Sequence, residues 1–235
     1  VTPLLLIWYD RVFVASSWHE VIRRRWMVHG PLLAVLSAVA VYVAMRSSWY
    51  AAGGVLVLDE VSVMEYARTQ PAVILHYLKL AFWPNGQCLD YAWPVADSFG
   101  EIVLPLAIIG VLLGLELWAI GHWPAAAFAG GWFFLLLAPT SSLIPIRDLA
   151  FEHRMYLPLA AVATLVAVVG YRVLEIAAAR FSARPEKLRF IGSVGVVLVT
   201  LVLAMVARAR NEVYSSEVAM WTDVVNKAPH NGRAH

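Results

Sequence analysis

Two long apolar stretches constrain this chain more than any other feature of its sequence. Residues 101–121 and 190–207 each hold enough apolar residues to cross roughly 30 Å of hydrocarbon as a helix. The composition agrees, since 61% of the 235 residues are hydrophobic and 14% are charged. A soluble domain is about half apolar and a quarter charged. We therefore predict an all-α membrane protein built as a multi-pass helical bundle.

Further apolar segments complete the predicted bundle. We expect full spans also at Met27–Met45, Ala125–Ala138 and Leu157–Val173, and a partial span at Val1–Tyr9, which makes five full spans plus one partial. Within the long loop 47–100, residues 71–82 are apolar but only about 12 residues long, which suits an interfacial or re-entrant helix. Glu116 falls near the cytoplasmic end of its span, so we expect its side chain to reach the interface.

The loops between these spans differ in charge, and the difference predicts the orientation. Residues 10–26 and 175–189 carry four Lys or Arg each, and alternation of the spans places both on one side. Short loops rich in positive charge face the cytoplasm. The loop 139–158 and the tail from Arg208 therefore face the periplasm or an organelle lumen.

The tail, residues 208–235, reads as a separate extracytoplasmic region after a membrane region of residues 1–207. Val218, Trp221, Val224 and Val225 recur at helical spacing, and a Pro-Asn turn and Arg-Ala-His follow. This pattern is typical of the start of a tetratricopeptide repeat (TPR), although a plain amphipathic helix fits it equally. Because the chain begins without Met and ends within a polar segment, we expect it to be truncated at both ends.

Charge concentrates in the loop PTSSLIPIRDLAFEHRMYLPL, residues 139–159. Its ionisable residues are Arg147, Asp148, Glu152, His153 and Arg154. Such groups are costly at membrane depth, so the cluster predicts a functional site. The two arginines suit a phosphate, and Glu152 and His153 could exchange a proton with a substrate. A salt-bridge network of Asp148, Glu152 and Arg154 that braces the loop explains the same residues, and the spacing alone favours neither interpretation.

Other site types receive little support from the sequence. Glu152 and His153 are adjacent and diverge on a helix, so we expect no metal and no cofactor. Asp90, in the aromatic-rich stretch CLDYAWP, is a better catalytic candidate than Asp59 or Glu60, although a solvated loop acid is the simpler reading. The net charge of +2 does not indicate a nucleic-acid partner.

Four stretches together resemble one protein family. They read APTSSLIPIRDLAFEHRMYLPLA, PLLLIWYDRVF, TQPAVILHYLKLAFWPNGQCLDYAWP and, in the tail, W…AP.N.RAH. They are similar to segments of the transmembrane and TPR repeat-containing O-mannosyltransferases, and most of all to the bacterial branch of that family.

The resemblance implies a GT-C glycosyltransferase in a bacterial inner membrane. It would transfer a sugar from a polyprenyl-phosphate-linked donor to a protein Ser or Thr on the extracytoplasmic side, with the TPR region available to the protein acceptor. It implies substrate-binding roles for Arg147, Asp148, Arg154 and Tyr156 and catalytic roles for Glu152 and His153. The catalytic acid of this family lies in the first extracytoplasmic loop, which we expect to precede residue 1.

Two other functions fit the sequence. One is a non-enzymatic membrane anchor that presents a TPR scaffold for protein–protein interaction. The other is a polyprenyl-lipid transporter, which should show internal repeats of its spans, and the sequence shows no such repeats.

Overall fold

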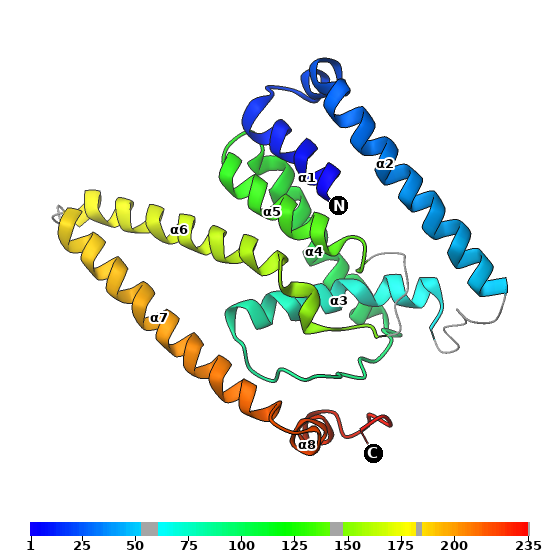
Figure 1. Cartoon of the computed structure of the whole chain (residues 1–235). Coiled ribbons are helices and arrows are strands. Elements are labelled where there is room, and N and C mark those ends of the chain that lie inside the picture. Colours follow the sequence, from blue (N-terminus) through cyan, green and yellow to red (C-terminus); the bar gives the residue numbers. More distant parts are fainter. Residues whose placement is uncertain (53–60, 142–147, 182–184, 235) are drawn as a thin grey trace.

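The computed structural model describes residues 1–52, 61–141, 148–181 and 185–234, and these ranges form helices and loops without a strand. The predicted all-α class is therefore confirmed. The α-helices are α1 (Thr2–Tyr9), α2 (Trp18–Ala52), α3 (Val63–Phe82), α4 (Phe99–Ala119), α5 (Pro124–Leu137), α6 (Pro158–Phe181), α7 (Pro185–Val213) and α8 (Glu217–Lys227), as Figure 1 shows. A π-helical turn, η1 (Asp10–Val14), joins α1 to α2, and a 3-10 turn, η2 (Glu152–Met155), precedes α6.

Four of these helices are long and apolar enough to cross a membrane. The candidate spans are Trp18–Tyr42, Phe99–Ala119, Pro158–Arg180 and Glu186–Val213, and at most 11% of any of them is buried inside the protein. Apolar side chains exposed along whole helices require an apolar surrounding, because water would not solvate them favourably. The four helices therefore suggest an integral membrane protein.

The remaining predicted span, Ala125–Ala138, differs from the structure. It corresponds to α5, which has 14 residues and is therefore only about 21 Å long at 1.5 Å per residue. Pro124 begins this helix and Pro139 follows it, and proline at both ends prevents a longer helix. The described residues therefore hold four candidate spans rather than five, and the shorter apolar helix α5 packs against α1, α4 and α6.

Two helices are longer than the apolar pattern predicted. α2 begins at Trp18 rather than Met27. Ser17 caps its start by accepting a hydrogen bond from the Glu20 amide, and the polar first turns of the helix continue into its apolar part. α3 covers 20 residues rather than 12, since Ser62 and Glu65 form a capping box at its start. A capping box satisfies backbone donors that the apolar pattern does not report.

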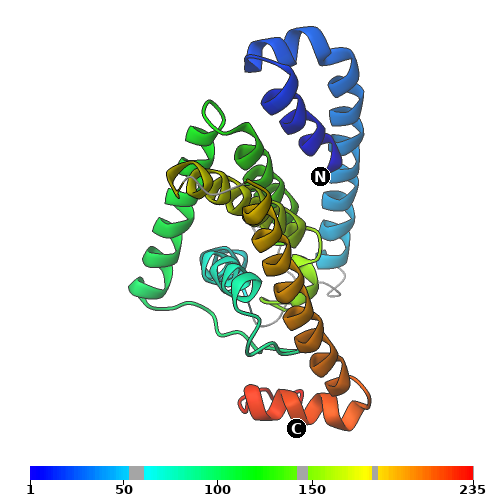
Figure 2. The same cartoon turned by 90° about the vertical axis from the view of Figure 1, so that its left-hand side faces the viewer.

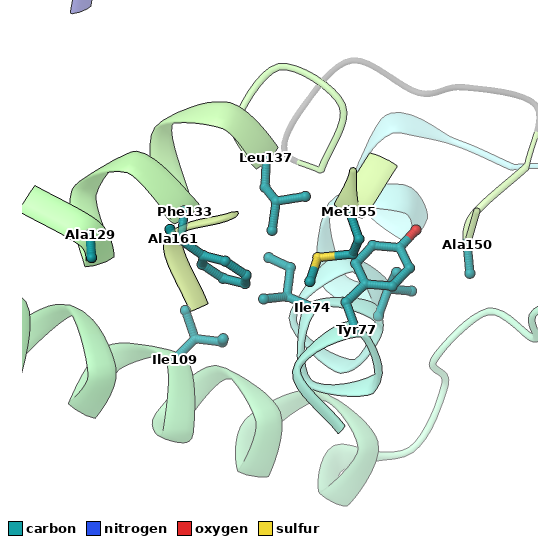
Figure 3. Close-up of a cluster of buried hydrophobic side chains, with 10 residues drawn as sticks. Ile74, Tyr77, Ile109, Ala129, Phe133, Leu137, Ala150, Met155 and Ala161 are labelled. Atoms are coloured by element: carbon teal, nitrogen blue, oxygen red, sulfur yellow. The ribbon is translucent and has the colours of Figure 1, made fainter. Parts of the chain in front are cut away.

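The buried core holds the charged loop against α3. Ile74 and Tyr77 of α3 pack with Phe133 and Leu137 of α5 and with Met155 of η2, as Figure 3 shows. Figures 1 and 2 show α8 at one end of the molecule, the turn between α1 and α2 at the other, and α3 between them. The core thus holds the loop around η2 against α3, and hydrogen bonds from Lys227 and Asn231 join the tail to the loop after α3.

Candidate functional site

A pocket of about 420 Å³ opens beside the charged loop, between the end of α3, the start of α6 and the end of α7. Its lining combines apolar and polar side chains. The apolar lining residues include Leu80, Ala81, Met155 and Leu159, and the polar ones include Gln87, Glu152, His153, Tyr156 and Tyr214. The pocket can therefore hold a ligand that has both an apolar and a hydrogen-bonding part.

Glu152 is the acid that lines this pocket. Its Oε1 accepts a hydrogen bond from the Tyr91 hydroxyl at 2.6 Å and another from the backbone amide of Cys88 at 2.8 Å. No bond joins its other oxygen, Oε2, to any residue in the ranges that the structure describes. Two donors thus fix the carboxylate while Oε2 remains able to accept a proton.

Tyr91 stays protonated in this arrangement. Burial is the largest effect that raises the pKa of its phenol, and the hydrogen bond to the Glu152 carboxylate raises it further. A phenol with a raised pKa remains a donor across the physiological pH range. Tyr91 can therefore orient Glu152 at any pH at which the protein would work.

Arg154 braces the loop from within. Its Nη1 donates to the Tyr66 hydroxyl at 3.3 Å and to the carbonyls of Thr140 and Leu149 at 3.2 and 3.1 Å, and its Nη2 donates to the carbonyl of Asp148 at 2.5 Å. Arg154 does not line the pocket. The resemblance assigned Arg154 to substrate binding, whereas this geometry favours a role in bracing the loop. Arg154 braces it through backbone carbonyls and not through the side chains of Asp148 and Glu152.

Asp90 and Asp148 face the tail rather than the pocket. Arg233 Nη1 lies 3.2 Å from Asp90 Oδ2 and 2.5 Å from Asp148 Oδ1. Asp90 also accepts a hydrogen bond from the Ala92 amide at 3.0 Å, as a short turn requires. The structure therefore gives both predicted site residues a structural partner and places neither among the pocket-lining residues.

The other predicted site residues divide into two groups. His153 and Tyr156 line the pocket, where Tyr156 is exposed and the His153 ring contacts the Phe151 ring at 4.8 Å between centroids. Arg147, with Asp59 and Glu60, lies outside the described residues. In the described ranges no group of three His, Cys, Asp or Glu side chains is arranged to hold a metal ion.

Tyr91, Tyr214 and Arg233 also belong to this region, although no sequence pattern predicted a role for them. In the stretch CLDYAWP, the predicted candidate is Asp90, but Tyr91 is the residue whose side chain contacts Glu152. Tyr214 and Arg233 both lie in the tail. Arg233 follows Asp148 by 85 residues in the sequence. No local pattern connects residues so far apart, so only the fold could assign them to this site.

These observations define an all-helical protein with four apolar helices suited to a membrane and an amphipathic pocket at one end of them. Comparison with models of protein families, with curated proteins and with solved structures gave no match to this chain. The resemblance to the O-mannosyltransferase family therefore stays a prediction from the quoted sequence stretches.

Proposed function

We propose that this chain is the membrane region of a GT-C-like glycosyltransferase. It would transfer a sugar from a polyprenyl-phosphate donor to a protein Ser or Thr on the extracytoplasmic face of a bacterial inner membrane. The observation that carries the proposal is the Glu152 carboxylate, in which Oε1 accepts two hydrogen bonds while Oε2 accepts none from the part of the chain that the structure describes. The sequence resemblance supports the same reaction.

The shape of the pocket supports a lipid-linked substrate. Leu80 near the end of α3 and Leu159 at the start of α6 supply apolar surface, and α6 is one of the candidate spans, along which a polyprenyl chain could leave the pocket for the bilayer. Gln87, Glu152 and Tyr214 supply the hydrogen-bonding groups that a sugar requires. An isoprenoid chain and a sugar need these two surfaces next to each other.

In the proposed reaction, Glu152 Oε2 accepts the proton of the acceptor hydroxyl. The hydroxyl oxygen attacks the anomeric carbon, the bond from that carbon to the phosphate oxygen breaks, and the polyprenyl phosphate leaves with inversion of configuration. Because the Nη groups of Arg154 donate to backbone carbonyls and a hydroxyl, we assign the charge stabilisation of the departing phosphate to Arg147. An alternative role for Glu152 is to orient the acceptor hydroxyl for another base.

The test is transfer from a polyprenyl-phosphate sugar by the full-length protein with Glu152→Gln. We expect the rate to fall about 100-fold or more, as is usual on loss of a general base. Glu212→Gln, which changes an exposed glutamate at the end of α7, is the matched control and should keep the wild-type rate. Wild-type transfer by Glu152→Gln at normal expression would refute the role of Glu152.

The pH dependence separates the two possible roles of Glu152. If it is the base, the Gln variant should lose the acidic limb of the pH–rate profile, whereas an orienting role leaves that limb in place.

Replacing Arg147 with Gln should lower turnover without lowering expression. Replacing Arg154 with Gln should instead lower thermal stability, because backbone carbonyls that it satisfies would lose a charged donor.

A non-enzymatic anchor for a TPR scaffold is the second candidate. The observation that favours it is the pair of ion pairs from Arg233 to Asp90 and Asp148, which ties the tail to the membrane region. An anchor requires this attachment, but it does not require a carboxylate such as Glu152 that can accept a proton. The absence of any transfer by the wild-type protein, together with partner binding by the tail, would favour the anchor.

A further inference from the structure

The tail contacts the loop after α3 at four points. Lys227 Nζ donates to the carbonyl of Gln87 at 2.6 Å, His230 Nε2 lies 3.3 Å from the carbonyl oxygen of Ala92, and Asn231 Nδ2 donates to the carbonyl of Asp90 at 3.2 Å. Arg233 makes the fourth contact, with the Asp90 carboxylate. Figure 2 shows α8 crossing the end of the molecule next to this loop. We name residues 227–233 the tail clamp.

Arg233 joins two segments that would otherwise repel each other. The carboxylates of Asp90 and Asp148 are only 11% and 18% exposed, and both lie within 3.2 Å of the same nitrogen. Two carboxylates held so close together need a cation between them. The buried Asn231 orients Arg233, since its Oδ1 accepts a hydrogen bond from the Arg233 amide at 3.0 Å.

The segment that the tail clamp holds also carries the two donors to Glu152. Residues 87–92 provide the Cys88 amide and the Tyr91 hydroxyl, and Asp90 lies between them in sequence. The Asp148 carboxylate lies four residues before Glu152 on the other loop. The bridge through Arg233 therefore joins the segment that donates to Glu152 and the segment that contains Glu152.

We propose that Arg233 is a positioning residue, which clamps residues 87–92 onto the loop of Glu152 and thereby fixes the orientation of the Glu152 carboxylate. The effect on transfer rests on the proposed function, whereas the clamping of the loop does not. The two parts can therefore be tested separately in the same variants.

Cys88 reports the state of the clamp directly. It is the single cysteine of the chain, its side chain is 2% exposed, and its thiol donates to the carbonyl of Asp90. A maleimide can react with a buried thiol only when the surrounding segment opens. The measurement is the rate of Cys88 modification in the full chain in detergent micelles, compared with the rate after denaturation.

We expect Arg233→Gln to raise this rate about tenfold, the equilibrium effect of losing roughly 1.4 kcal/mol, which is at the lower end for hydrogen bonds to charged groups. The modification rate of Arg233→Lys should lie between those of wild type and Arg233→Gln, because an ammonium keeps the charge but does not reproduce the paired N–H donors of a guanidinium. Arg208→Gln, which changes an exposed arginine of α7, is the control and should match wild type. Asp148→Asn removes one partner of the bridge and serves if Arg233→Gln does not fold.

The activity measurement uses the same variants with a polyprenyl-phosphate sugar. Arg233→Gln should lower kcat with little change in the KM for the donor, and Arg233→Lys should restore part of kcat. An unchanged Cys88 rate in both Arg233→Gln and Asp148→Asn overturns the clamp. Faster Cys88 modification with unchanged kcat overturns the positioning role. If the wild-type protein transfers no sugar, the proposed function fails and the Cys88 rates alone decide whether the clamp exists.

Discussion

At the scale of single residues, His76 is placed where its charged form is disfavoured. Its ring lies 5.0 Å from the Tyr91 ring and 4.8 Å from the Trp93 ring between centroids. Its Nε2 is buried and has no hydrogen-bond partner in the described ranges. Burial first, and then the positive charge of Lys79, lowers the pKa of His76 below its ordinary value of 6.5.

This lowered pKa predicts a loss of stability in mild acid. Below pH 6.5 the unfolded chain protonates His76 while the folded protein resists protonation, so the unfolded state binds more protons. The free energy of unfolding should therefore fall as the pH drops from 7 towards 5, and level off below the folded-state pKa. Thermal unfolding in detergent measures this, and His76→Phe should flatten the profile. An equally steep profile in that variant would contradict the assignment.

Tyr91 and Arg154 show why the sequence found the site only in part. The charge density of residues 147–154 predicted a site in this loop, and Glu152 and His153 of the loop line the pocket. Which charged side chain faces the pocket depends on partners far away in sequence, such as Tyr66 for Arg154. The sequence therefore identified the loop, while long-range hydrogen bonds assign the role of each residue.

At the scale of helices, two adjacent glycines determine how α5 packs. A Cβ atom on Gly130 would lie 1.8 Å from Glu116 Oε2 of α4, and one on Gly131 would lie 2.0 Å from Trp8 Nε1 of α1. The Trp8 indole donates to the carbonyl of Ala127 at 3.1 Å. Glu116 thus packs against α5, contrary to the expectation that it reaches the interface, and both helices approach α5 closely because the glycines have no side chain.

We expect Gly131→Ala to destabilise the protein by about 1–3 kcal/mol, the usual effect of overpacking. The rigid indole of Trp8 would have to move and would lose its bond to Ala127. Gly130→Ala should lower the free energy of unfolding by less, because the end of the flexible Glu116 side chain can shift. Gly114→Ala on α4 is the control, since a Cβ there meets nothing within 4 Å. Thermal unfolding of the three variants tests this order, and equal midpoints for Gly131→Ala and Gly114→Ala would contradict it.

At the scale of the whole molecule, the pocket and the tail lie at one end of the apolar helices. The connection from α4 to α5, which contains His122, follows the other end of α4. The predicted orientation places the first end outside the cytoplasm and the second end inside.

Labelling in intact cells tests this orientation. In a Cys88→Ser background, Asn85→Cys should react with a membrane-impermeant maleimide, because Asn85 is exposed at the pocket end. His122→Cys, exposed at the opposite end, should react only after the membrane is permeabilised. Equal labelling of both in sealed cells would argue against the predicted topology, and the reverse pattern would invert it.

The sequence by itself determined the all-helical class, the position of most apolar helices and the loop that contains the pocket acid. These depend on composition, on runs of apolar residues and on local charge, all of which are properties of neighbouring residues. Only the tertiary structure decided that α5 is a short packed helix, that Arg154 braces the loop, and that Arg233 joins Asp90 to Asp148. These features depend on contacts between residues far apart in the chain, and no local pattern encodes such contacts.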